Sequence, residues 1–183
     1  MDKDLFGQKI KEPPKKLTRL EKTVLKYDND SFDGKVERLK YLNSIFPKNL
    51  CLMGDMEFIY TFSEIQNCYM NGNFIASIVL TQAFIEKILV SFFIEQGLEK
   101  ETKYGLDKMI RYAKKYNLIH TTILDMINNI RLNRNPFVHS QCNHNCTNLS
   151  LRSFKNKIYP IIQLQKEATE GLQVLSHILQ HNF

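Results

Sequence analysis

The segment 131–139, RLNRNPFVH, brings arginine, asparagine and histidine side chains together within a short stretch of chain. An arginine guanidinium is always charged, and its planar N–H groups bind two phosphate oxygens at once. A histidine exchanges protons near neutral pH, and an asparagine amide both donates and accepts hydrogen bonds. This chemistry suits a phosphodiester, so Arg134, Asn135 and His139 are the candidate catalytic residues. Arg131 is a candidate for a further phosphate contact, and a solvated surface charge is its alternative role.

The proline within this segment decides how these side chains are placed. Arg134 and His139 are five residues apart, so a continuous helix would direct them about 140° apart. Pro136 removes a backbone hydrogen bond and disfavours helical angles at Asn135, which predicts a kink or a restart of the helix. A bend there would direct both side chains to one pocket. The alternative is a surface loop in which the histidine has only a structural role.

Two segments resemble the HEPN superfamily. The sequence RNPFVH at 134–139 resembles the R-x4–6-H motif of that superfamily, in which a polar residue commonly follows the arginine. The segment 71–86, NGNFIASIVLTQAFIE, resembles the long core helix that precedes the motif in many HEPN proteins and often carries an acidic residue at the position of Glu86. The resemblance extends over roughly residues 55–180 and implies an all-α fold.

The resemblance also implies a chemistry. Many HEPN proteins are metal-independent ribonucleases, often in toxin–antitoxin or antiviral defence systems. In such an enzyme Arg134 neutralises the phosphate, Asn135 positions the scissile group and His139 moves a proton. Glu86 would support the site by pairing with Arg134 or His139. A partly exposed carboxylate beside Lys87 is the alternative for Glu86.

The same resemblance implies the partners. HEPN domains usually form dimers in which two motifs face one another, so the expected partners are RNA and a second copy of this chain. A cognate antitoxin or another protein is a further candidate partner, and no cofactor or metal is expected. The alternative function is a non-catalytic, dimeric interaction module that binds a protein or a nucleotide.

Bulk composition is that of an ordinary globular domain. The chain has 183 residues, of which 43% are hydrophobic and 24% charged, which predicts one domain with a sizeable core. Its net charge of +6 favours an anionic partner such as nucleic acid. The first residues lack the apolar run of a secretory signal, so we expect a cytoplasmic protein whose four cysteines are reduced.

One segment, 74–94, is long and apolar enough to cross a membrane. Gln82, Glu86 and Lys87 interrupt its centre, where a charged residue costs about 2.5–3.5 kcal/mol on insertion. We therefore expect a buried helix of a soluble bundle and no membrane partner.

Apolar spacing and turn-forming residues predict an all-α, up-and-down helical bundle, and the HEPN resemblance implies that it dimerises. Residues 1–34 are expected to be an irregular, mildly basic lead, with a short helix over 17–27 and a loop over 29–34. Residues 35–183 are expected to form a single helical domain. Its helices are predicted at 35–46, 55–70, 74–96, 106–116, 118–133 and 149–180, the last bent at Pro160.

Two groups of residues have the composition of metal ligands. Cys142, His144 and Cys146 provide three candidate zinc ligands, but structural zinc sites usually need four. His177 and His181 lie one helical turn apart and lack an identifiable third ligand. We therefore predict no metal site, and the first group is expected to be a polar loop beside the candidate site.

Overall fold

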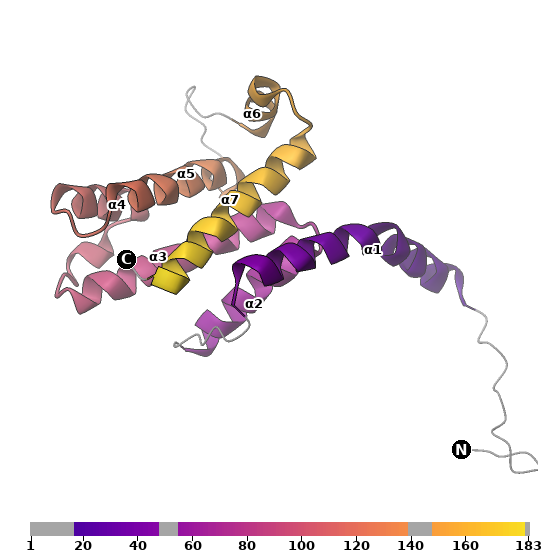
Figure 1. Cartoon of the computed structure of the whole chain (residues 1–183), viewed down its shortest axis with the longest axis horizontal. Coiled ribbons are helices and arrows are strands. Elements are labelled where there is room, and N and C mark those ends of the chain that lie inside the picture. The colour runs from indigo at the N-terminus through magenta and orange to yellow at the C-terminus, as the bar shows by residue number, and fades with distance from the viewer. Residues whose placement is uncertain (1–16, 48–54, 139–147, 182–183) are drawn as a thin grey trace, which may run out of the picture. The chain divides into compact units, whose positions relative to one another are not determined.

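The computed structural model describes residues 17–47, 55–138 and 148–181, and all regular structure among them is helical (Figure 1). The predicted all-α class is therefore confirmed. The elements are α1 (Arg19–Ile45), α2 (Met56–Met70), α3 (Phe74–Glu95), the short 3-10 helix η1 (Glu101–Lys103), α4 (Leu106–Lys115), α5 (Thr121–Val138), α6 (Leu149–Asn156) and α7 (Pro160–His181).

The chain divides into two compact units, Met1–Gly34 and Lys35–Phe183. In the first unit the described residues from Arg19 onward belong to α1, so the loop predicted at 29–34 is wrong. The helix starts with a capping box, in which Glu21 N–H donates to Thr18 Oγ1 (3.2 Å) and Thr18 N–H to Glu21 Oε2 (2.7 Å). The turn-forming residues 29–34 each cost a helix about 1 kcal/mol or less relative to alanine, so they do not force a break.

The second unit starts its helices where local signals predicted them. Asp55 caps α2, since its Oδ1 accepts from Phe58 N–H at 2.7 Å. The turn between α2 and α3 contains Gly72 at φ +79°, a conformation that glycine adopts without strain. Arg38 binds this turn, because its Nε donates to Met70 O at 2.8 Å. The helices predicted at 55–70, 74–96 and 106–116 are therefore confirmed to within a residue or two.

Helix α3 is the centre of the second unit, where it packs against α2, α5 and α7. Phe84, Ile85, Leu89 and Phe93 on this helix are each at most 1% exposed. Among the described residues α3 is the one helix long and apolar enough to cross a membrane, and 44% of its most apolar window is buried. Core helices commonly share these properties, so the finding does not contradict a soluble protein.

Three helix boundaries differ from the predictions. Helix α5 starts at Thr121 and continues through Pro136 to Val138. The predicted helix over 149–180 is two helices, α6 and α7. They are separated at Lys157, which adopts the left-handed conformation with φ 55°. Pro160 begins α7, a position where its missing N–H costs no hydrogen bond.

Candidate functional site

The end of α5 positions the part of the motif that the structure describes. Arg134 and Asn135 are both helical and half-buried, and the helix does not restart at Pro136. The restart of the helix, one of the two predicted outcomes of that proline, does not occur. Pro136 has no N–H to donate to the carbonyl of residue 132, and α5 continues for two residues beyond it despite this cost. His139 lies outside the described residues.

Arg131 connects α5 to α4. Its Nη2 lies 3.1 Å from Asp107 Oδ1 in α4, and its side chain is 20% exposed. Its Nε and Nη2 also donate to Asn128 Oδ1 at 3.1 and 2.9 Å. The Arg131 charge is therefore balanced within the protein, so we assign this residue to the contact between α4 and α5 rather than to a phosphate.

Glu86 has a neutral partner on its own helix. It is half-buried, and its Oε2 accepts from Gln82 Nε2 at 2.8 Å, one turn earlier in α3. Within the described residues Glu86 does not pair with Arg134, one of its two expected partners. The physical reason is that Gln82, only 2% exposed, already offers a donor within the same helix face. The other expected partner, His139, lies outside the described residues.

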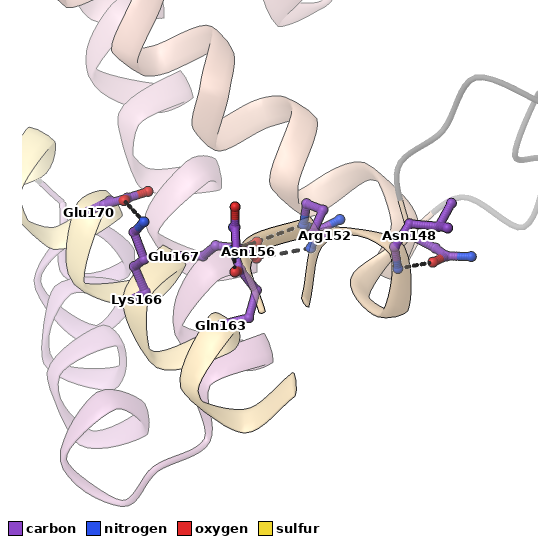
Figure 2. Close-up of polar contacts among 8 residues, drawn as sticks. Asn148, Arg152, Asn156, Gln163, Lys166, Glu167 and Glu170 are labelled. Carbon is purple, nitrogen blue, oxygen red and sulfur yellow. Dashed lines mark hydrogen bonds and ion pairs between the residues drawn. The ribbon is translucent and has the colours of Figure 1, made fainter. Parts of the chain in front are cut away.

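A buried polar network that the sequence analysis missed lies between α6 and α7 (Figure 2). Arg152 in α6 binds Glu167 in α7 through two parallel hydrogen bonds, Nε to Oε1 at 2.6 Å and Nη2 to Oε2 at 2.9 Å. The side chains of this ion pair are 10% and 2% exposed. Such a two-pronged contact is the strongest arrangement available to an arginine and a carboxylate.

Two amides extend this network. Gln163 Nε2 donates to Glu167 Oε1 at 2.7 Å, and Asn156 Nδ2 donates to Gln163 Oε1 at 2.8 Å (Figure 2). The network therefore runs from the last residue of α6 to the second turn of α7. It fixes these two helices together across the break at Lys157.

The network also contacts the motif. The Arg152 guanidinium carbon lies 5.9 Å from the centre of the Phe137 ring, a cation–π distance. Phe137 belongs to the motif segment and lies in the last turn of α5. The Arg152–Glu167 pair therefore holds the end of α5 against α6 and α7. We treat both residues as positioning residues of the candidate site.

A sequence signal for this network exists in α7. Buried apolar residues Leu164, Ala168, Leu172 and Leu175 define one face of that helix, and Glu167 lies on the same face. A carboxylate at such a position needs a partner, because charged residues are almost never fully buried alone. The sequence does not name the partner, since Arg152 lies in the preceding helix.

The candidate metal ligands are only partly described. Among the residues that the structure describes, no group of three or more His, Cys, Asp and Glu side chains is arranged to hold a metal ion. Cys142, His144 and Cys146 lie outside those residues, as does the side chain of His181.

In comparisons with known proteins, no protein-family model, no curated protein and no solved structure matches this chain. The expected membership of the HEPN superfamily therefore stays a prediction from the segments 134–139 and 71–86.

Proposed function

We propose that this protein is a metal-independent endoribonuclease that cleaves RNA by transesterification, with Arg134, Asn135 and His139 as its catalytic residues. The single observation that carries the proposal is the placement of Arg134 and Asn135 in the last turns of α5. This end of the helix is braced by Phe137 against the buried Arg152–Glu167 pair. A braced helix end suits catalysis, because small errors in the position of a catalytic group lower the rate steeply.

In the proposed reaction the 2′-hydroxyl of one nucleotide attacks the adjacent phosphorus. The proton of that hydroxyl passes to a base, and the departing 5′-oxygen receives a proton from an acid. His139 serves in one of these roles, since an imidazole titrates near neutral pH. Arg134 neutralises the charge that builds up on the phosphorane oxygens, and Asn135 orients the scissile group. The products are a 2′,3′-cyclic phosphate and a 5′-hydroxyl.

The motif holds one histidine per chain, which suggests a composite site in which a second copy supplies the other proton-transfer group. A two-fold interface brings such a pair together, because each surface meets its own copy. Helix α3 is strongly apolar, but much of it is buried in the core. Exposed apolar side chains lie on α1, and also on α6, in the connection to α7 and at the start of α7. Those around α6 and α7 are Leu151 (55% exposed), Phe154 (85%), Tyr159 (76%), Ile161 (56%) and Ile162 (50%).

We therefore place the proposed dimer interface on α6 and the first turn of α7, next to the network that holds the motif. The variant Phe154→Glu tests this assignment, since a side chain that is 85% exposed carries little of the monomer's packing. Sedimentation velocity should show a dimer for the wild type and a monomer for the variant, and cleavage should be lost with the dimer. A wild-type chain that stays monomeric at micromolar concentration rules out the composite site.

The test of the enzyme itself is incubation of the purified protein with total RNA in EDTA, followed by analysis of the RNA ends. Cleavage should persist in EDTA and leave cyclic phosphates. His139→Ala should lower the rate at least about 100-fold, the usual scale for general acid–base catalysis. The matched control is His144→Ala, five residues further along the chain and outside the motif, and it should retain activity.

A second pair of variants tests the phosphate contact. Arg134→Lys should be severely impaired, because one ammonium group cannot reproduce a planar, two-pronged contact. Arg111→Lys, an exposed arginine of α4, is its control and should cleave normally. If the wild type never cleaves RNA, or if His139→Ala unfolds the chain, the motif is structural. The protein would then be an interaction module.

A further inference from the structure

A cleft of about 750 Å³ lies between α5 and α7, away from the network between α6 and α7. Its apolar lining includes Ile123, Ile130 and Val174. Its volume lies within the range of small-molecule sites, which is about 300–1,000 Å³. The cleft is therefore large enough for a planar ring system.

Amide side chains line the same cleft from both helices. Asn129 and Asn133 are one turn apart on α5, and Gln173 comes from α7. Each amide offers two donors and an acceptor. Within the described residues, the side chains of Asn129 and Asn133 form no hydrogen bond with another protein group. Their hydrogen-bonding groups are therefore available to a ligand.

The charged residues that line the cleft do not suit a phosphate group of a ligand. None of the described residues that line it is a lysine or an arginine. Glu170 lines the cleft, and its Oε1 lies 3.9 Å from Nζ of Lys166 (Figure 2). Lys166 itself is not among the described lining residues. A phosphate inside would meet the Glu170 carboxylate and no lysine or arginine, and the basic groups in the described lining are the imidazoles of His120 and His177. The matching ligand is neutral and flat, with an apolar face and hydrogen-bonding groups along its edge.

We propose that this cleft binds one unpaired nucleobase of the RNA substrate. Amide side chains pair with adenine through one donor and one acceptor, whereas guanine is usually read by arginine or lysine. Adenine should therefore be preferred over guanine. Asn133 directly precedes Arg134 in α5, where consecutive side chains point about 100° apart, so the base cleft and the proposed phosphate contact occupy different faces of the same helix end. The inference rests on the proposed function, because it names the base-binding part of that site.

Binding is tested on the full chain carrying His139→Ala, so that cleavage does not interfere. Adenosine and guanosine are titrated separately, and binding is followed by saturation-transfer NMR and chemical-shift changes. Adenosine should bind more tightly than guanosine. The double substitution Asn129→Ala and Asn133→Ala should weaken adenosine binding at least about tenfold, the scale of one lost bidentate pair.

The matched control is Asn43→Ala, an exposed asparagine of α1 that does not line the cleft. It should leave adenosine binding unchanged. Equal adenosine affinity in the double variant and the control would overturn the inference, as would absence of nucleoside binding by a chain that cleaves RNA. Adenosine binding that depends on the two asparagines, in a wild type that never cleaves RNA, would retain the cleft and refute the ribonuclease.

Discussion

Breaking the Arg152–Glu167 pair on one side should destabilise the fold strongly. In Arg152→Met the carboxylate of Glu167, whose side chain is 2% exposed, stays in the interior without its counter-charge. The remaining donor in the network is Gln163 Nε2, which already binds Glu167 Oε1 in the wild type and so replaces neither hydrogen bond that is lost with Arg152. Methionine keeps the aliphatic length of arginine, so the change removes charge and hydrogen bonds more than packing.

The magnitude follows from burial. Removing one partner of a buried pair costs about 3–5 kcal/mol, because an uncompensated charge stays in the interior. For a chain of this size, 1 kcal/mol shifts the melting temperature by about 2–4 °C, so we expect a fall of roughly 10 °C. Replacing both partners, as in Arg152→Met with Glu167→Met, removes the stranded charge. The double variant should therefore recover most of the lost free energy of unfolding.

Urea unfolding of the wild type, both single variants and the double variant gives a double-mutant cycle. The control is the Lys166–Glu170 pair in the same helix, with an N–O distance of 3.9 Å and side chains 57% and 51% exposed. Because solvent screens such pairs, Lys166→Met should cost less than about 1 kcal/mol. A cost below about 1 kcal/mol for Arg152→Met as well would refute the reasoning, since the pair would then behave as a surface contact.

Three further predictions concern single side chains. Gly171→Ala should be neutral or stabilise by up to about 1 kcal/mol in thermal unfolding, since alanine favours a helix. Its new Cβ would meet Thr81 Cγ2 at 3.4 Å, so the larger Gly171→Leu should destabilise. Burial raises the pKa of the Tyr41 hydroxyl above its ordinary 10.0. The contribution of the protonated Tyr41 hydroxyl to the free energy of unfolding is fully present below pH 10 and is lost as the pH rises through the raised pKa. Tyr41→Phe should therefore flatten the alkaline fall in the free energy of unfolding. Asp107→Asn removes the ion pairs of both Arg131 and Arg111. It should steepen the salt dependence of RNA binding by the number of released arginines that reach RNA, and an unchanged slope would show that neither of them does.

Local signals in the sequence were sufficient for most of the helices. The start of α2, the break between α2 and α3 and the end of α3 lie within a residue or two of the predicted bounds. The break expected at 29–34 failed because turn formers only weaken a helix, and propensity does not decide alone. Pro136 did not end the helix at residue 133, because tertiary context can override one unfavourable residue.

The candidate site was less predictable than the fold, because its support comes from residues distant in sequence. Glu86 and Glu167 are both carboxylates within otherwise apolar helix faces, and the same reasoning applies to each. Glu86 is satisfied within its own helix by Gln82, whereas Glu167 binds Arg152 across a helix break. Only the three-dimensional arrangement distinguishes a local partner from a distant one.

The charges around the end of α5 bear on how the net charge should be interpreted. Arg131 and Arg152 both carry acidic partners, Asp107 and Glu167, and each joins α5 or the adjoining α6 to another helix. Their contribution is to the position of the motif rather than to the attraction of RNA. The net charge of +6 is therefore weak evidence for a phosphate site at this place. A count of basic residues cannot distinguish a catalytic arginine from one that only adds positive charge. Substitutions at Arg134, compared with matched substitutions at other arginines, make this distinction.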